Sequence, residues 1–147
     1  MAENPFIGAW RLESFEFRSA NGQVSYPYGQ DVHGYIMYAQ DGYMSVAFMR
    51  AGRPHFNSED FLTGSIEEKV LAFDTYFSYC GKYELRGDKV IHHIEVSLFP
   101  NWTGKDQERF YRFDGDRLIL STPPLLAQGI EQTGHLIWKR SRMVTQS

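Results

Sequence analysis

The stretch Tyr83-Glu84-Leu85-Arg86-Gly87-Asp88-Lys89-Val90-Ile91 places two strand-forming runs on either side of a Gly-Asp pair. The same pattern returns as Tyr111-Arg112-Phe113-Asp114-Gly115-Asp116-Arg117-Leu118-Ile119. Aromatic and β-branched residues favour strands, whereas glycine and aspartate favour tight turns. The sequence therefore predicts two antiparallel hairpins, each built on a Gly-Asp turn.

Similar runs of strand-forming residues lie on both sides of this pair of hairpins. They cover residues 8–18, 35–40, 43–49 and 133–140. The pair Asp41-Gly42 is a strong signal for a hairpin with a two-residue turn. Many short strands without a regular alternation of strand and helix predict an antiparallel barrel or sandwich.

One segment has helical rather than strand periodicity. Ser65 and Glu68 have the spacing of a capping box, and apolar residues then recur at helical spacing until Gly81. These features predict one helix over residues 65–79. Residues 50–63, rich in glycine, proline and polar residues, would form either a lid over a barrel mouth or a connection that plugs one end.

Length, composition and charge limit the class of protein. The chain has 147 residues, which suits a single domain over residues 1–147 with a core over about 6–140. Basic residues are scattered, so we expect no nucleic-acid partner. No apolar stretch reaches bilayer length and the N-terminus lacks a signal-peptide pattern, so we expect no membrane partner and a cytoplasmic location. The single cysteine suits a reducing compartment.

No pattern for a metal or a cofactor stands out. His92 and His93 are neighbours on a predicted strand and would point to opposite faces. The other histidines lack the spacing of metal ligands, and no nucleotide-binding fingerprint is present. We therefore expect no metal and no cofactor, while the oligomeric state stays open.

Several motifs resemble those of a known family. Gly8-Ala9-Trp10 resembles the Gly-x-Trp signature of lipocalins, in which the tryptophan closes one end of the barrel, and Arg140 matches the arginine that covers it. Longer stretches resemble the bacterial and fungal lipocalin-like domain family. They are Gly34-Tyr35-Ile36-Met37-Tyr38, Asp41-Gly42-Tyr43-Met44-Ser45-Val46, His92-His93-Ile94-Glu95-Val96-Ser97-Leu98-Phe99-Pro100-Asn101-Trp102 and Leu120-Ser121-Thr122-Pro123-Pro124.

This resemblance implies an all-β fold, a closed antiparallel lipocalin-like (calycin) β-barrel with one inserted helix. It also implies a small-molecule ligand, and some members of the family act in natural-product pathways as cofactor-free cyclases or isomerases. The chain departs from secreted lipocalins in lacking a disulfide pair and their Thr-Asp-Tyr motif. These departures argue against a secreted transport role.

Strand alternation divides the side chains between the barrel interior and the surface. The residues expected inside are Met44, Val46, Phe48, Tyr83, Leu85, Val90, His92, Ile94, Val96, Arg109, Tyr111, Phe113, Leu118, Leu120 and Trp138. For the first of these strands the apolar set Met44, Val46 and Phe48 is preferred, and the alternative set Tyr43, Ser45 and Ala47 would leave more room inside. His93 and Glu95 then face the surface, and Arg50 lies at the rim. We expect a cavity on the order of 300 Å³ or more, with Tyr83, His92, Arg109 and Tyr111 in its wall.

The leading hypothesis is a barrel that binds an apolar or aromatic metabolite with an acidic or enolisable group, and it leans to a cofactor-independent isomerase or cyclase in a biosynthetic pathway. His92 would move protons, because imidazole titrates near neutral pH. Arg109, with Arg50 as a further candidate, would stabilise oxyanion charge, and the tyrosines, Tyr111 among them, would orient the substrate. The side chains expected to bind the ligand are Tyr83, Arg50, Phe48, Phe113, Leu120 and Trp138.

Two other functions use the same residues. The alternative is a non-catalytic carrier or sensor of a small hydrophobic ligand, and a third possibility is a barrel filled by its own side chains. In a passive pocket His92 would hydrogen-bond a tyrosine or a carbonyl group, and Arg109 would form an ion pair or reach solvent at the rim. Residue types alone do not separate these functions.

Overall fold

The computed structural model describes residues 3–142, in which most regular structure is β-strand. In chain order the elements are β1 (Gly8–Ser19), β2 (Val24–Ser25), β3 (Val32–Tyr38), β4 (Tyr43–Arg50), α1 (Ile66–Asp74), β5 (Tyr76–Arg86), β6 (Lys89–Ser97), the 3₁₀ helix η1 (Pro100–Trp102), β7 (Asp106–Asp114), β8 (Arg117–Ser121), β9 (Leu125–Ala127) and β10 (Ile130–Arg140).

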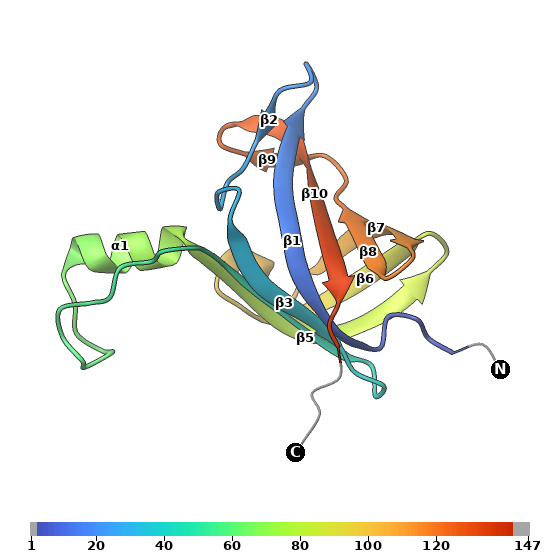
Figure 1. Ribbon diagram of the computed structural model, residues 1–147, viewed down its shortest axis with the longest axis horizontal. Helices are drawn as coiled ribbons and strands as arrows, with labels where there is room; N and C mark the ends of the chain where they lie inside the picture. Colours follow the sequence, from blue (N-terminus) through green and yellow to red (C-terminus); the bar gives the residue numbers. More distant parts are fainter. Residues whose placement is uncertain (1–2, 143–147) are drawn as a thin grey trace.

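The strands form a closed antiparallel barrel. The circuit runs β1-β3-β4-β5-β6-β7-β8-β10 and closes because β10 also pairs with β1 (Figure 1). The short strands β2 and β9 attach to β1 and β10 at one end of the barrel. The predicted all-β barrel with one helix is confirmed. Within residues 3–142 no helix is long and apolar enough to cross a bilayer.

The hairpins follow the local sequence closely. β5 and β6 join through Gly87-Asp88, and β7 and β8 join through Gly115-Asp116, as predicted. The two glycines have φ angles of 64° and 62°, which a residue without Cβ adopts easily. The hairpin of β3 and β4 differs from expectation. β3 ends at Tyr38 and β4 begins at Tyr43, so the loop covers residues 39–42 and is longer than two residues.

Helix α1 begins with the predicted capping box but ends earlier than predicted. The side chain of Ser65 accepts a hydrogen bond from the backbone of Glu68, whose carboxylate accepts one from the backbone of Ser65. Residues 76–79, predicted as the last helical turn, instead begin β5. Phe77 and Tyr79 fit both periodicities, and pairing with β4 decides for the strand.

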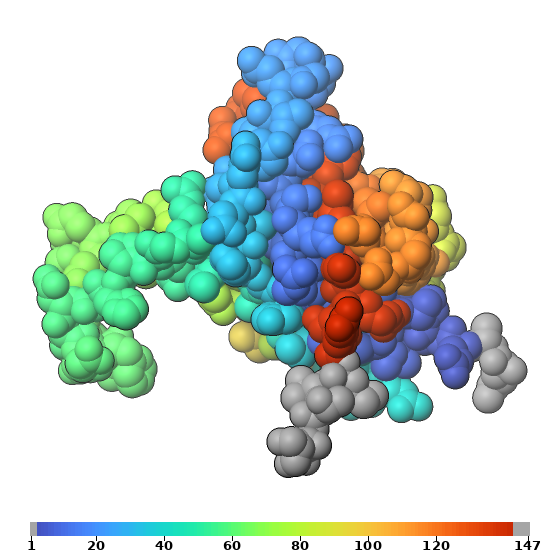
Figure 2. All heavy atoms as spheres, in the orientation of Figure 1, coloured from blue at the N-terminus to red at the C-terminus, as the bar shows by residue number. Residues whose placement is uncertain are grey.

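The segment that carries α1 stands apart from the barrel. Figures 1 and 2 show α1 and the loop before it projecting from the side of the barrel. None of the α1 side chains is buried, and Phe61 in the preceding loop is 88% exposed. The segment therefore does not plug an end of the barrel.

At the closed end of the barrel, the side chains of Trp10 and Arg140 hold the N-terminal segment in place. The indole nitrogen of Trp10 donates to the carbonyl oxygen of Phe6 at 2.9 Å. The guanidinium of Arg140 lies 4.1 Å from the Trp10 ring centre and donates to the carbonyl oxygens of Pro5 and Ile7. The expected covering of Trp10 by Arg140 is confirmed.

Phe6 fills this end of the barrel. Its side chain is fully buried, and its ring contacts Tyr38, Tyr111 and Phe113 at centroid distances of 5.1, 4.8 and 5.1 Å. All three contacts are edge-to-face, the geometry that aromatic quadrupoles favour. A residue that precedes the first strand thus forms part of the core.

Replacing Phe6 with alanine should destabilise the barrel by about 3–5 kcal/mol, because it leaves a cavity among aromatic side chains. Urea unfolding followed by tryptophan fluorescence measures the loss. Phe61→Ala is the matched control and should change stability by no more than about 0.5 kcal/mol, since Phe61 is exposed. Equal losses in the two variants would contradict the role given to Phe6.

Candidate ligand-binding site

The barrel interior contains a cavity of about 230 Å³, smaller than expected from the sequence. Its wall is mostly aromatic and aliphatic. Aromatic side chains in the wall include Phe15, Tyr28, Phe48, Phe77, Trp102 and Trp138. The polar side chains that border it include Tyr79, His92, Arg109 and Thr122. No residue from 51 to 75 is part of the described wall, so that segment is not a lid here.

Five predicted site residues border this cavity. They are Phe48, His92, Arg109, Leu120 and Trp138. His92 is 1% exposed and Arg109 is 7% exposed, so their inward orientation is confirmed. Because His93 and Glu95 lie on the outer face, alternation along β6 also holds up to this point.

The other four predicted site residues lie outside the cavity wall. Tyr111 and Phe113 pack against Phe6 at the closed end, and none of these three residues borders the cavity. The hydroxyl of Tyr83 donates to the Ala39 carbonyl oxygen beyond the closed end. These three placements correct the expectation.

Arg50 is exposed at the rim, as predicted, but does not border the cavity. Its guanidinium donates to the carbonyl oxygen of Pro27 at 3.4 Å. Thus neither the expected oxyanion contact of Arg50 nor a contact of Tyr111 with a ligand in this cavity is supported.

Two more inward assignments are corrected. Val96 is 64% exposed because a β-bulge opposite Cys80 and Gly81 adds Glu95 to β6 and reverses the alternation beyond it. Leu85 is 41% exposed near the Gly87-Asp88 turn, past the enclosed part of the barrel.

Sequence reasoning missed the tyrosines that hold His92. The hydroxyl of Tyr38 lies 2.8 Å from Nε2 of His92, and the hydroxyl of Tyr79 lies 2.7 Å from Nδ1. Both tyrosines are buried. The predicted helix over residues 65–79 includes Tyr79, whereas strand alternation counted back from Tyr83 places Tyr79 inside the barrel.

Burial keeps all three groups uncharged near neutral pH. It holds the pKa of His92 well below its ordinary value of 6.5, and the positive charge of Arg109 lowers that pKa further. Burial also raises the pKa of Tyr38 and of Tyr79, while Arg109 opposes both shifts. The imidazole of His92 is therefore a neutral link between two protonated phenols.

Arg109 supplies the positive charge of the site. Its Nη1 donates to the backbone carbonyl oxygen of Glu108 at 2.9 Å and to the side chain of Gln107 at 3.4 Å. Its guanidinium lies 5.8 Å from the ring centre of Trp102. Within residues 3–142 no carboxylate lies within 4.0 Å of it, so the internal ion pair considered from the sequence does not form there.

The lipocalin-like domain model matches residues 7–141, nearly the whole described barrel. The chain belongs to this lipocalin-like family. A relative, the 4'-hydroxy-3'-methoxypropiophenone carrier protein ppsC of Aspergillus oryzae, is 39% identical over 111 residues. That match covers 69% of this chain and the full length of the relative. A lipocalin-like barrel with an internal cavity and a carrier protein as relative supports small-molecule binding.

The outer face of the lipocalin-like barrel places a second histidine in the opposite environment. Nδ1 of His93 lies 2.7 Å from Asp106, and Nε2 lies 2.8 Å from Glu84. Hydrogen bonds to these two carboxylates raise the pKa of His93 above 6.5. Adjacent residues on one strand thus have pKa values shifted in opposite directions.

These shifts predict opposite pH dependences of stability. His93 has a raised pKa in the folded state, so its contribution is complete below pH 6.5 and is lost as the pH rises through the folded pKa. His92 has a lowered pKa, so its contribution is complete above pH 6.5 and is lost as the pH falls toward the folded pKa.

Urea unfolding of His92→Gln and His93→Gln between pH 5 and pH 9 tests both signs. The stability difference between wild type and His93→Gln should shrink as the pH rises, and the difference for His92→Gln should shrink as the pH falls. Each variant controls for the other. Parallel pH profiles would contradict the opposite environments.

Proposed function

We propose that this protein is a carrier that binds a small aromatic molecule inside the barrel and holds one of its oxygen atoms against Arg109. The observation that carries this proposal is a buried guanidinium without a carboxylate partner in the described chain, at the edge of an apolar cavity. A buried charge is costly unless it is compensated. An oxygen of a ligand would provide that compensation.

The size and walls of the cavity support an aromatic ligand. A cavity of about 150 Å³ lined by apolar side chains is enough for benzene. A volume of 230 Å³ therefore leaves room for a ring with short substituents. Phe48, Phe77 and Trp102 offer both ring faces and ring edges for contact.

The chemistry of Arg109 further limits the classes of ligand that fit this site. A guanidinium only donates hydrogen bonds, so it pairs with carbonyl, phenolate or carboxylate oxygens. The relative ppsC is named for carriage of an aromatic ketone with a hydroxyl and a methoxy group. An oxygenated aromatic compound of that class is the ligand that this site fits best.

We favour carriage over isomerase or cyclase chemistry because of His92. Both ring nitrogens are occupied by tyrosine hydroxyls at 2.8 and 2.7 Å, and burial keeps the ring neutral. A catalytic base must reach the substrate proton directly or through one water. The proton-shuttle role of His92 stays a prediction from the sequence, but this geometry gives it little support.

Binding of 4'-hydroxy-3'-methoxypropiophenone, measured by isothermal titration calorimetry, tests the proposal. Arg109→Met keeps the length of the apolar stem and removes the charge, and it should weaken binding by about 1.5–3 kcal/mol. Arg112→Met on the same strand is the control, because Arg112 is exposed on the outer face. Unchanged affinity in Arg109→Met would contradict the proposal.

Carriage and catalysis differ in the fate of the bound molecule. After prolonged incubation with the protein, the compound should be recovered unchanged by liquid chromatography and mass spectrometry. A new product of equal mass that forms with wild type, but not with His92→Gln, would favour the isomerase hypothesis instead.

A further inference from the structure

The segment that joins β4 to β5, residues 51–75, is an arm that projects from the barrel (Figure 1). Its base is fixed, because the guanidinium of Arg53 donates to the hydroxyl of Thr75 and to the carbonyl oxygen of Ala72, both at 3.0 Å. Helix α1 in this arm has nine residues, and none of its side chains is buried. Isolated helices shorter than about 12 residues are only marginally stable in water. The arm therefore holds out a short helix that lacks the packing such a helix needs.

One side of α1 is an apolar stripe that faces solvent. Ile66, Val70 and Phe73 are spaced by four and three residues, so they lie on the same side of the helix. Their exposed fractions are 77, 53 and 49%. Helices with an apolar stripe normally bury it against another surface. We call these three side chains the helix stripe.

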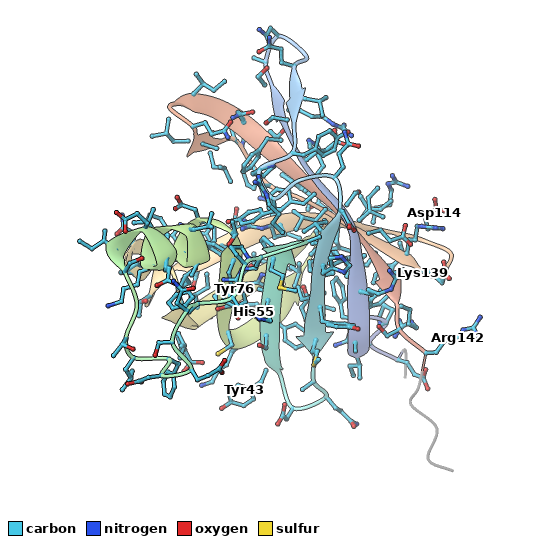
Figure 3. The ribbon with its side chains drawn as sticks, turned by 60° about the vertical axis from the view of Figure 1, so that its left-hand side comes forward. Tyr43, His55, Tyr76, Asp114, Lys139 and Arg142 are labelled. Carbon is cyan, nitrogen blue, oxygen red and sulfur yellow. The ribbon has the colours of Figure 1, made fainter. Side chains whose placement is uncertain are left out.

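A second exposed apolar surface lies on the outside of β3, β4 and β5. The strands are paired so that outward positions stand side by side, with Tyr35 opposite Ala47 and Ala47 opposite Ser78. Tyr76 lies next to the base of the arm, and Tyr43 lies at the far end of β4 (Figure 3). We call this surface the outer apolar face. Its large side chains are Tyr35, Met37, Tyr43, Met49 and Tyr76, and the small side chains between them are Ser45, Ala47, Ser78 and Cys80.

The charges of the arm and of the outer apolar face are complementary. β3, β4 and residues 76–82 of β5 contain no carboxylate. Lys82 lies beside Tyr43 at one edge of the face, and Arg11 stands opposite Tyr35 at another. The arm has two basic side chains and five carboxylates, which belong to Glu59, Asp60, Glu67, Glu68 and Asp74. The arm of one copy is therefore attracted to the face of another copy.

This charge pattern is unlike that of a helix that binds a membrane. Helices that lie on bilayers are rich in lysine and arginine on their polar side, and anionic lipids attract those residues. Helix α1 has Glu67, Glu68 and Asp74 but a single basic residue, Lys69. A second copy of the chain fits the stripe better than a lipid surface does.

We propose that the protein is a two-fold dimer in which the helix stripe of each copy packs on the outer apolar face of the other. Both surfaces belong to the same chain, so the contact forms twice and the assembly closes. The exposed parts of their large apolar side chains amount to several hundred Å² per chain, and each partner of a standard interface buries about 800 Å². Neither surface borders the cavity, so the dimer leaves the ligand site unchanged.

Sedimentation equilibrium of the full chain over a range of concentrations tests the dimer. The wild type should reach twice the chain mass of 17.1 kDa. Val70→Lys places a positive charge against the face that carries Lys82, and Met37→Glu places a negative charge against the acidic arm. Each variant should raise the dissociation constant of the dimer by about 100-fold or more, because like charges meet at both symmetric contacts. A wild type that stays monomeric at the highest concentration overturns the proposal.

An equimolar mixture of the two variants tests whether the contact is reciprocal. In the mixed dimer one contact joins two unchanged surfaces, and the other joins the Val70→Lys helix to the Met37→Glu face, where the new charges attract. The mixture should therefore form dimers although each variant alone does not. A Met37→Glu protein that dimerises as well as wild type, or a mixture that stays monomeric, overturns the reciprocal contact.

Phe110→Glu is the matched control for a charge placed on an exposed apolar position. Phe110 lies on the outer side of β7, and β7 is opposite β3 in the circuit of strands. This variant should dimerise like wild type. Loss of the dimer in Phe110→Glu would contradict the assignment of the interface to β3, β4 and β5.

Binding of 4'-hydroxy-3'-methoxypropiophenone separates this inference from the carrier proposal. Val70→Lys and Met37→Glu should bind the compound as tightly as wild type, since neither residue borders the cavity, and this binding also shows that both variants are folded. A monomeric wild type that binds the compound overturns the dimer and leaves carriage intact. A dimeric wild type that does not bind it supports the dimer and contradicts carriage.

Discussion

The contact of the Arg140 guanidinium with the Trp10 indole is the interaction on which the rest of the structure depends. Trp10 belongs to the first barrel strand and Arg140 to the last, and the two residues stand opposite each other where the barrel closes. Arg140 also binds backbone carbonyl groups of the N-terminal segment, and Trp10 binds that of Phe6. The same contact therefore joins the ends of the sheet and presses Phe6 into the interior.

Some polar groups inside the barrel have hydrogen-bond or charge partners in the described chain, and others lack them. His92 is paired at both ring nitrogens, so it contributes to stability without needing a ligand. Arg109 lacks a carboxylate and Trp138 lacks an acceptor within the described chain. Unmet donors reduce the stability of the empty protein. On the proposed function, a ligand oxygen that pairs with Arg109 recovers that free energy as affinity.

The neighbours His92 and His93 show how strongly the two faces of one strand differ. One ring is enclosed by aromatic side chains, and burial lowers its pKa. The other lies between two carboxylates at the surface, and hydrogen bonds raise its pKa. The low dielectric of the interior disfavours the charged imidazole, whereas nearby negative charge favours it. Although the ring of His92 borders the cavity, tyrosine hydroxyls lie within hydrogen-bond distance of both of its nitrogen atoms.

Local sequence patterns were sufficient for the strands, the two Gly-Asp turns and the inward faces of His92 and Arg109, because each depends on neighbours only a few positions away. They did not predict the end of the helix, since residues 76–79 fit two periodicities and pairing with β4 decides between them. The bulge that turns Val96 outward exists only when β5 and β6 align. The shape of the site depends on contacts between residues that are still farther apart in the sequence. Phe6 contacts side chains from β3 and β7, and those strands enclose it only when the barrel is closed.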